Sequence, residues 1–489
     1  MGQLPRLSPS VKTNLAAGVQ GARALQACRN VLNGAAKGFN LEGPMTAIVS
    51  RKAGALQGEA RVPGDKSISH RALMIGANAV GETRVHGLLE GDDVMATAES
   101  LRALGAEITK LPDGQGNVTW QVYGRGVGGL AEPARVLDLR NSGTGARLLM
   151  GLLASQPFTS VITGDESLVE RPMERVMGPL RRMGATFVGR SGGRLPVAVT
   201  GTDSPLPIVE TLKVASAQLK SAILFCGLNG PGTTTVIEPT ASRDHTETLL
   251  RYFGAEVEVA AEGNRGRRIT LKGRPELTGQ SVTVPADISS AAFPLVAAVI
   301  VPGSSVVLRQ VGLNPLRTGL LTCLREMGAT IETREERDQG GEAYADIAVT
   351  AGRLTGITVP PERAPSMIDE YPILAAAAAC AEGVTRFEGV AELRVKESDR
   401  LAGIAQGLAA CGVRIEEGED WLAIHGLGRP PTGGATIKTR LDHRIAMAFL
   451  VLGMASDKDV RIDDGRPIAT SFPGFVAMMN KLGGRLATG

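Results

Sequence analysis

The feature of this 489-residue sequence that most restricts its fold is a short pattern that occurs six times. Each copy consists of a helical turn, a glycine, usually a small residue, and the start of a strand. Glycine at this point is typical of a helix C-terminus, because the left-handed backbone that releases a chain from a helix costs glycine little. The copies follow one another at intervals of 70 to 84 residues, and their glycines are Gly105, Gly184, Gly254, Gly328, Gly412 and Gly483.

A second pattern precedes each copy. A polar segment containing Ser or Asp leads into an Ala- and Leu-rich helix, a glycine turn and a β-branched strand. Each unit is therefore predicted to contain, in order, a strand, a buried helix, a strand, an amphipathic helix and a strand. Helices such as 373–381 are apolar on all sides, so we expect them in the interior. The six segments are residues 62–87, 137–164, 212–239, 284–311, 359–389 and 437–464.

Six such units predict an α/β protein of α+β character. A helix that is apolar on all sides has to be covered by other helices and by a sheet, so several units must pack together. The symmetrical arrangement is two domains of three units each. A single solenoid of repeats is the alternative that the pattern alone leaves open.

Composition excludes several classes of protein. Lys and Arg (53) nearly balance Asp and Glu (50), and Phe, Tyr and Trp total 16, so we expect no nucleic-acid partner. The five cysteines are scattered and form no CxxC pair, which disfavours a disulfide framework or a zinc site and indicates a reducing compartment, the cytoplasm. The longest strongly apolar run, residues 291–302, is too short to cross a bilayer, so no membrane association is predicted.

The first 44 residues differ from the rest. They hold five basic residues and no acid before Glu42. We interpret residues 1–45 as a disordered N-terminal extension. An organelle-targeting presequence, which is typically Arg-rich and poor in acids, is the alternative.

Positively charged clusters stand at the beginning of several predicted buried helices. Helix N-termini carry unpaired N–H groups and partial positive charge, so they favour anions. Because equivalent positions of repeated units tend to face the same region, we expect one cleft for more than one anionic group. The cations concerned are Lys66, Arg71, Arg171, Arg243, Lys396, Arg400 and Arg444.

Each cluster has a purely structural alternative when it is considered alone. Ser67 could simply cap a helix, and Lys396 and Arg400 could be a solvated pair on one helix face. Asp369 and Glu370 could cap the apolar helix that follows them. The recurrence of cations at matching points of several repeats favours a functional role. The histidines of these clusters are not at metal-ligand spacing, so no metal is predicted.

Nine short strings, in order along the chain, match motifs of one family. From about residue 50 to its C-terminus the sequence resembles the EPSP synthase (3-phosphoshikimate 1-carboxyvinyltransferase) family, and it is most similar to the class II bacterial form. The strings are residues 64–71 (GDKSISHR), 141–145 (NSGTG), 171–173 (RPM), 216–218 (SAQ), 243–247 (RDHTE), 366–372 (SMIDEYP), 394–400 (RVKESDR), 441–444 (LDHR) and 469–473 (ATSFP).

This resemblance implies the two-domain enolpyruvyltransferase fold, with six βαβαββ repeats, three per domain, around buried helices. In that fold the chain starts in the second domain, builds the first and returns. The crossovers would fall near Gly64 and Ala286. One domain would therefore comprise residues 65–285, and the other residues 46–64 plus 286–489. The family also implies a monomer.

The resemblance further implies an activity in the shikimate pathway to chorismate and the aromatic amino acids. The carboxyvinyl group of phosphoenolpyruvate is transferred to the 5-hydroxyl of shikimate 3-phosphate, and phosphate is released, without a metal, another cofactor or a covalent nucleophile. Both substrates carry a phosphate and a carboxylate, so fixed cations must hold them against their mutual repulsion. By resemblance, Asp369 takes the proton of the attacking hydroxyl. Glu397, with Lys66 nearby, protonates the methylene carbon of phosphoenolpyruvate and later removes a proton.

The same resemblance implies two overlapping sets of binding residues. The set for shikimate 3-phosphate is Lys66, Ser67, Arg71, Ser216, Ala217, Gln218, Arg243, Asp369 and Lys396. The set for phosphoenolpyruvate is Lys66, Gly143, Arg171, Gln218, Arg400 and Arg444.

The sequence departs from its relatives at two places. Glyphosate-insensitive class II members carry Ala at the position of Gly143, so we expect glyphosate to inhibit this chain more strongly than it inhibits them. The class I family carries a Lys near Thr470 and Ser471, and none stands there in this chain.

Two alternative functions stay open. The sister enolpyruvyltransferase that acts on UDP-N-acetylglucosamine shares the fold, but it usually needs a loop Cys as general acid, and residues 167–183 contain none. Its usual Lys-Asn pair is also replaced by Lys66-Ser67. The other alternative is a non-catalytic anion-binding relative, which the presence of Asp369 and Glu397 beside the cations disfavours.

Overall fold

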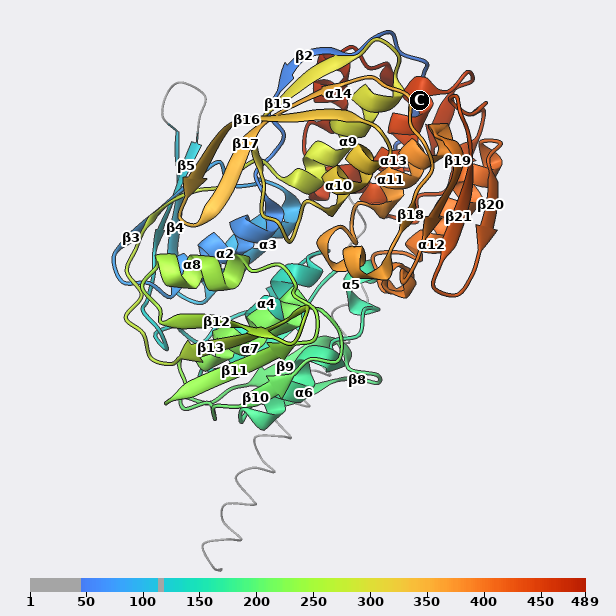
Figure 1. Cartoon of the computed structure of the whole chain (residues 1–489). Helices are drawn as coiled ribbons and strands as arrows, with labels where there is room; N and C mark the ends of the chain where they lie inside the picture. The colour runs from blue at the N-terminus through green and yellow to red at the C-terminus, as the bar shows by residue number, and fades with distance from the viewer. Residues whose placement is uncertain (1–44, 113–117) are drawn as a thin grey trace, which may run out of the picture.

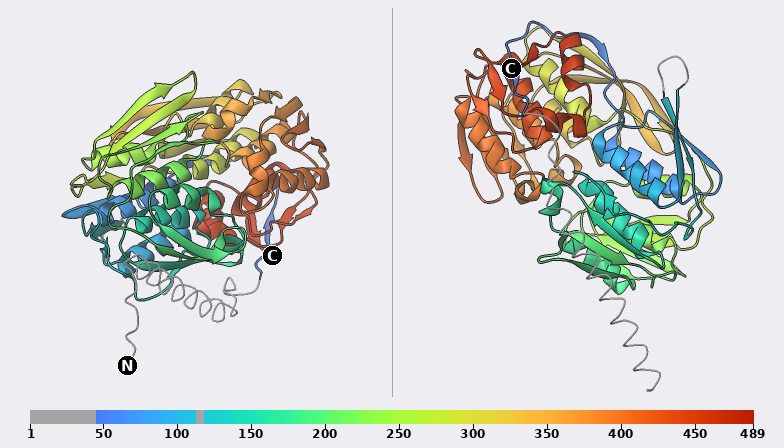
Figure 2. Two further views of the ribbon diagram at one scale, coloured as in Figure 1. Left: turned by 90° about the horizontal axis from the view of Figure 1, so that it is seen from below. Right: turned by 180° about the vertical axis from the view of Figure 1, so that it is seen from behind.

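The computed structural model describes residues 45–112 and 118–489, and the extension predicted for residues 1–45 lies outside them apart from Met45. The described residues form six four-stranded sheets with helices between the strands. Figure 1 shows two lobes, one made of elements coloured blue to green and the other mainly of elements coloured yellow to red. The view from behind in Figure 2 shows the same division. The predicted two-domain α/β fold is therefore confirmed.

Three sheets belong to the first lobe, and each is a parallel pair of strands extended by two antiparallel neighbours. Their orders are β14-β3-β5-β4, β6-β7-β9-β8 and β10-β11-β13-β12. The strands are β3 (Glu82–His86), β4 (Glu107–Pro112), β5 (Val118–Tyr123), β6 (Leu137–Asp138), β7 (Thr159–Thr163), β8 (Thr186–Arg190), β9 (Arg194–Thr200), β10 (Val209–Thr211), β11 (Thr233–Glu238), β12 (Val257–Glu262), β13 (Gly266–Lys272) and β14 (Ser281–Thr283). The helices are α2 (Lys66–Ala77), α3 (Asp92–Ala103), α4 (Gly143–Ala154), α5 (Glu166–Val169), α6 (Glu174–Arg182), α7 (Ala217–Gly227) and α8 (His245–Tyr252).

The three sheets of the second lobe repeat this pattern. Their orders are β2-β15-β17-β16, β18-β19-β21-β20 and β22-β23-β1-β24. The strands are β1 (Ile48–Ser50), β2 (Gln57–Ala60), β15 (Ser305–Gly312), β16 (Thr330–Gln339), β17 (Glu342–Thr350), β18 (Thr358–Val359), β19 (Glu382–Phe387), β20 (Arg414–Glu417), β21 (Leu422–Leu427), β22 (Thr436–Ile437), β23 (Val460–Ile462) and β24 (Leu486–Thr488). The helices are α9 (Ile288–Ile300), α10 (Gly319–Glu326), α11 (Tyr371–Cys380), α12 (Arg400–Ala410), α13 (His443–Ala455) and α14 (Phe475–Lys481), with short 3₁₀ helices η1 (Pro361–Ser366), η2 (Ala391–Val395) and η3 (Arg466–Thr470).

The chain passes between the lobes twice, and the two passages lie side by side. Strands β1 and β2 precede the first lobe in sequence but complete sheets of the second lobe, and β14 closes the first sheet of the first lobe. Between them, Gly64 and Ala286 form an isolated β-bridge. The Asp65 N–H donates to the Pro285 carbonyl at 2.8 Å, and the Asp287 N–H donates to the Pro63 carbonyl at 2.9 Å. We call these two paired passages, residues 63–65 and 285–287, the hinge, and it joins the segments that lead into α2 and α9.

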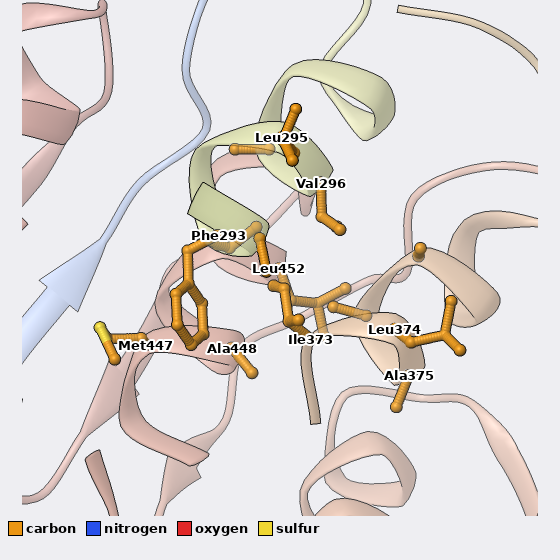
Figure 3. Packing of buried hydrophobic residues seen from close by; sticks show 14 of the residues in the cluster. Phe293, Leu295, Val296, Ile373, Leu374, Ala375, Met447, Ala448 and Leu452 are labelled. Carbon is orange, nitrogen blue, oxygen red and sulfur yellow. The ribbon is translucent and has the colours of Figure 1, made fainter. Parts of the chain in front are cut away.

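Each lobe has its own hydrophobic core around buried helices. Figure 3 shows the core of the second lobe, where Phe293 of α9, Ile373 of α11 and Leu452 of α13 pack together. Helix α11 is buried along nearly its whole length, as its uniformly apolar sequence predicts. Burial of each large apolar side chain in these cores contributes about 1.5–3 kcal/mol to the free energy of unfolding. This packing fixes the helices and the residues at their N-termini. No helix in the described ranges is both long and apolar enough to cross a membrane.

The six repeated glycines all end helices with the left-handed backbone that the sequence predicts. A residue with a Cβ would be strained at such an angle, which explains why glycine recurs there. Their φ angles are 94° at Gly105, 110° at Gly184, 102° at Gly254, 98° at Gly328, 89° at Gly412 and 107° at Gly483.

Candidate active site

A cleft with a volume of about 400 Å³ lies between the two lobes, and residues of both line it. This volume falls within the range of pockets that bind small molecules. Both lobes contribute cations to the lining. Of the residues predicted for the site, the cleft is lined by Lys66, Ser67, Gly143, Arg171, Ser216, Ala217, Gln218, Arg243, Asp369, Lys396, Glu397 and Arg444.

The buried helices of all six repeats begin at this cleft. Their apolar faces are held in the two cores, so their N-terminal N–H groups point out of the cores. These partial positive charges add to the cationic side chains and favour anionic ligands. Side chains that accept a hydrogen bond from a nearby backbone N–H cap five of these helices, and they are Asp65, Ser142, Ser216, Asp287 and Asp442.

Asp369 is an ionised carboxylate among arginines. Its Oδ2 accepts a hydrogen bond from Arg243 Nη2 at 2.6 Å, and its Oδ1 accepts one from Arg400 Nη1 at 3.0 Å. Its backbone carbonyl accepts from Arg444 Nη1 at 3.0 Å. Burial alone would raise the pKa of Asp369, but the charges of Arg444, Arg243, Lys396 and Arg400 hold it well below its usual value. Asp369 is therefore ionised and balances positive charge in the cleft.

Glu397 has a similar environment. Its Oε2 accepts from Arg400 Nη2 at 2.5 Å, and its Oε1 lies 3.6 Å from Arg171 Nη1. Burial opposes ionisation, but Arg400 and Arg171 hold the pKa of Glu397 well below that of a free glutamate. Arg400 thus lies between the two acids and contacts both.

Ion pairs join the lobes across the cleft. The second-lobe acids Asp369 and Glu397 each face a first-lobe arginine, as described above. At the rim, Arg175 Nη1 lies 3.1 Å from Glu392 Oε1. These contacts offset the repulsion among the cations, so each lobe completes the charge pattern of the other.

The arrangement suits anion binding and proton transfer rather than metal binding. Within residues 45–112 and 118–489, no three His, Cys, Asp or Glu side chains are grouped so that they could hold a metal ion. His443 is the histidine that lines the cleft. Burial, with Lys66 and Arg444 nearby, holds the pKa of His443 well below its ordinary value, so this ring is neutral.

Comparison with known proteins identifies the family. Residues 50–479 match the model of the EPSP synthase (3-phosphoshikimate 1-carboxyvinyltransferase) family. The chain belongs to the EPSP synthase family. It is 63% identical over 440 residues to the 3-phosphoshikimate 1-carboxyvinyltransferase of Paramagnetospirillum magneticum, covering 90% of this chain and 98% of the relative. It is 61% identical over 428 residues to that of Rhodospirillum rubrum, covering 88% and 95%.

Solved structures agree with this family and with the predicted fold. An EPSP synthase from Acinetobacter baumannii superposes with a TM-score of 0.79 at 43% identity, covering 91% of this chain and all of the other. The enolpyruvyl transferase NikO from Streptomyces tendae superposes with a TM-score of 0.68 at 19% identity, covering 91% and 99%. The second similarity concerns the fold alone.

Two residues predicted to bind substrate lie behind the cleft wall of this EPSP synthase family member. Arg71 is buried and donates from Nη1 to the Ser67 carbonyl at 2.9 Å, from Nη2 to Ser221 Oγ and from Nε to Thr246 Oγ1. Arg400 is wholly buried, and it reaches the cleft through its contacts with the two acids. In this structure both arginines support residues that line the cleft.

Sequence reasoning missed several residues that line the cleft. Asp93, at the start of α3, has its Oδ2 3.0 Å from Lys66 Nζ, and no motif indicated this ion pair. Arg147 stands four residues after Gly143, next to a motif of the family, so its helical spacing could have revealed it. The position of Asp287 before a predicted buried helix was a comparable signal. The missed residues include Asp93, Arg147, Arg175, Asp287, Arg317 and Glu392.

Proposed function

We propose that this chain transfers the carboxyvinyl group of phosphoenolpyruvate to the 5-hydroxyl of shikimate 3-phosphate and releases phosphate. One observation carries the proposal: in a member of the EPSP synthase family, two ionised acids and arginines from both lobes meet in a single cleft. Positioning and fixed positive charge together can hold two anionic substrates there against their mutual repulsion.

The first-lobe wall and Lys396 suit shikimate 3-phosphate. We assign its binding to Lys66, Ser67, Ser216, Ala217, Gln218, Arg243, Asp369 and Lys396, with Arg71 holding the Ser67 carbonyl from behind the cleft wall. Support comes from the position of Ser216 at the N-terminus of α7 and from the 2.6 Å contact between Arg243 and Asp369, which brings both lobes to one point. Burial lowers the pKa of Lys396, and Asp369 opposes this effect, so an added phosphate would further favour the charged lysine.

We assign phosphoenolpyruvate to the neighbouring part of the cleft, near Glu397. The residues are Lys66, Gly143, Arg171, Gln218 and Arg444, with Arg400 holding Glu397 from behind the cleft wall. Arg171 is pre-oriented, because its Nη2 donates to Asn141 Oδ1 at 2.7 Å and to Ser167 Oγ at 3.1 Å. Gln218 is fixed as well, because its Nε2 donates to Thr144 Oγ1 at 2.9 Å and its Oε1 accepts from Arg147. Pre-oriented donors lose little conformational entropy when they bind a charged group.

In the proposed first step, Asp369 accepts the proton of the 5-hydroxyl while that oxygen bonds to the central carbon of phosphoenolpyruvate. The methylene carbon gains a proton at the same time, which gives a tetrahedral intermediate. Loss of a proton from the new methyl group and departure of phosphate then restore the double bond. Asp369 is ionised and can accept this proton, and substrate anions that engage Arg243 and Arg444 would offset their charge and raise the pKa of Asp369.

Glu397 is proposed as the acid that supplies the proton to the methylene carbon, with Lys66 nearby. This role requires a protonated carboxyl, whereas Arg400 and Arg171 now hold the pKa of Glu397 low. The anionic groups of phosphoenolpyruvate would engage Arg171 and add negative charge. Both effects favour protonation of Glu397, so binding of the substrate would prepare its own proton donor.

We further propose that the two domains are residues 65–285 and residues 46–64 plus 286–489. The two hydrophobic cores support this division, since one contains residues from Ile68 to Val284 and the other contains Ile48, Leu56, Val62 and residues from Ala286 onward.

We also propose a cytoplasmic monomer. The free thiols of Cys226, Cys323, Cys380 and Cys411 support a reducing compartment.

Phosphate release tests the proposed reaction. The full chain is incubated with shikimate 3-phosphate and phosphoenolpyruvate together, with each alone, and with UDP-N-acetylglucosamine as the acceptor. We expect phosphate only when shikimate 3-phosphate and phosphoenolpyruvate are both present. Release with UDP-N-acetylglucosamine would assign the chain to the sister reaction, and no release with any pair would identify a non-catalytic anion-binding protein.

Gly143→Ala is expected to weaken glyphosate binding. A Cβ at this position would lie 2.9 Å from Arg147 Nη1 and 2.9 Å from Arg171 Nη1, so it would narrow the part of the cleft assigned to phosphoenolpyruvate. A longer inhibitor should lose more than the substrate does. We expect the glyphosate inhibition constant to rise about tenfold or more, with a smaller rise in the KM for phosphoenolpyruvate. An inhibition constant for Gly143→Ala no higher than that of the unmodified chain would refute the assignment.

A further inference from the structure

Arg317 is a buried cation that the proposed mechanism does not use. It lies in the loop between β15 and α10 of the second lobe, is 3% exposed, and also lines the cleft. Its Nη1 donates to Asp65 Oδ2 at 3.1 Å, and its Nη2 donates to Asp287 Oδ1 at 3.2 Å and to Ser289 Oγ at 2.7 Å. One guanidinium therefore holds two buried carboxylates.

The two carboxylates cap helices of opposite lobes. Asp65 caps α2, whose first residue is Lys66, and Asp287 caps α9. Both stand directly beside the hinge, where the chain passes from one lobe to the other. The contact with Arg317 thus fixes the beginning of α2 relative to the beginning of α9.

A chain of hydrogen bonds continues from Arg317 to the cleft. Ser289 Oγ, which accepts from Arg317, donates to Glu370 Oε1. The same carboxylate oxygen accepts from Arg444 Nη1 at 3.3 Å. Arg317 is in this way connected both to the helix that carries Lys66 and to Arg444.

The loop that carries Arg317 is itself attached to the first lobe. Asn314 Nδ2 donates to Asp244 Oδ1 at 2.7 Å, and Asp244 directly follows Arg243. Asn314 Oδ1 accepts from the Leu316 N–H, and the Asn314 carbonyl accepts from the Arg317 N–H. A movement of the first lobe at either Asp65 or Asp244 would therefore act on this loop.

We propose that Arg317 is a positioning residue for the transfer reaction, joining the N-termini of α2 and α9 across the hinge and holding Lys66 and Arg444 in the arrangement that catalysis needs. This inference rests on the proposed function. Arg317 acts through other residues, and no direct contact with substrate is required of it.

Removing this cation would leave two acids facing each other in a buried site. Burial and the charge of Asp65 already raise the pKa of Asp287 to about 6, although Arg317 and Arg444 oppose the rise. The other titratable or charged groups that face Asp65 are His245, Arg243, Arg71 and His70. Glu370 and Asp369 face Arg317 and contribute further negative charge. Without Arg317, the second of the two acids would ionise only at higher pH, and its ionisation would push α2 and α9 apart.

Loss of Arg317 should make the activity depend on pH. At low pH, one acid of the pair is protonated and carries no charge, so the two carboxyl groups do not repel each other and the arrangement survives without Arg317. As the pH rises, both become charged and repel each other. The activity of Arg317→Gln, relative to the unmodified chain, should therefore fall as the pH rises.

The experiment measures kcat and KM by phosphate release between pH 6 and pH 9 for the full chain, three variants at Arg317 and one control variant. For Arg317→Gln we expect kcat to fall by about tenfold or more at pH 8.5, which corresponds to one pKa unit of interaction, and by less at pH 6. Arg317→Lys should recover part of the activity, because a cation returns. The double variant Arg317→Gln/Asp287→Asn should lose the pH dependence of the defect, since it holds one acid and a neutral cap. Arg334→Gln, which removes an exposed arginine paired within its own strand, is the charge-matched control.

The outcomes separate the two proposals. No phosphate release from the unmodified chain would overturn the proposed function, and this inference with it. Release from the unmodified chain, with an Arg317→Gln variant that is equally active or whose defect is the same at every pH, would overturn the inference alone. If Arg317→Gln does not fold, Arg317→Lys and the double variant Arg317→Gln/Asp287→Asn decide. Folded and active proteins in both cases support the role of Arg317. A double variant that also fails to fold contradicts it.

Discussion

Replacing Asp369 by Asn is expected to lower kcat about 10²–10⁴-fold, the usual contribution of a general base. The amide has nearly the same shape as the carboxylate but cannot take the proton of the attacking hydroxyl. Asp369 also balances Arg243 and Arg400, at 2.6 Å and 3.0 Å, so the variant leaves these cations more available to anions. We therefore expect KM values that change by much less than kcat. Steady-state phosphate release with both substrates measures both constants.

The control for this variant is Asp457→Asn, which changes an exposed acid that pairs with Lys52 far from the cleft. It should keep the kcat of the unmodified chain. Thermal unfolding of Asp369→Asn should show an intact fold. A folded Asp369→Asn variant with a kcat within tenfold of the unmodified chain would show that another group accepts the proton.

Arg400→Gln is expected to destabilise the second lobe by about 3–5 kcal/mol, the usual cost of breaking a buried ion pair from one side. Arg400 is wholly buried and contacts three acids, namely Asp369 at 3.0 Å, Glu397 at 2.5 Å and Asp442 at 2.9 Å. Without the arginine, their negative charges would face one another in a buried site. The melting temperature should fall by about 10 °C, and phosphate release should be nearly abolished because the acids lose their arrangement.

The pH dependence of stability gives a second measure of the same network. Arg400 helps to hold the folded pKa of Asp369 and Glu397 below that of an unfolded chain, against the effect of burial. Such acids stabilise the fold above their unfolded pKa, near 4, and this contribution is lost as the pH falls through the folded pKa. In Arg400→Gln, the stabilisation of the fold that Arg400 provides through these two acids should be absent even at neutral pH. Arg414→Gln, which removes an arginine 74% exposed, should change the melting temperature by little, and an equal loss in both variants would argue against a special role for Arg400.

The sequence was sufficient to predict the repeats and the helices that carry the site. The glycine at the end of each amphipathic helix and the apolar run before it are local signals, and local backbone preference decides them. The cationic residues at the helix starts were also visible, because symmetric repeats bring equivalent positions together. This is why Lys66 and Arg444, at the starts of two different buried helices, could be placed at one site, whereas Gly143 and Ala217 were assigned to it through the family resemblance.

The remaining features depend on tertiary contacts that no local pattern encodes. Asp93 pairs with Lys66 although 27 residues separate them, and Arg317 lies 252 residues from Asp65. The depth of a side chain was equally hidden. Arg71 and Arg400 look like surface cations in the sequence, yet packing places both behind the cleft wall. The pairing of each acid with an arginine of the opposite lobe could not be read from either lobe alone.

The most direct test of this account is the crystal structure of Asp369→Asn with shikimate 3-phosphate and phosphoenolpyruvate, since a slow variant retains both substrates. We predict both molecules side by side between the lobes, with shikimate 3-phosphate against Arg243 and Lys396, and phosphoenolpyruvate against Arg171 and Arg444. Density for either substrate outside this cleft, in crystals of a variant whose parent chain converts both, would contradict the account.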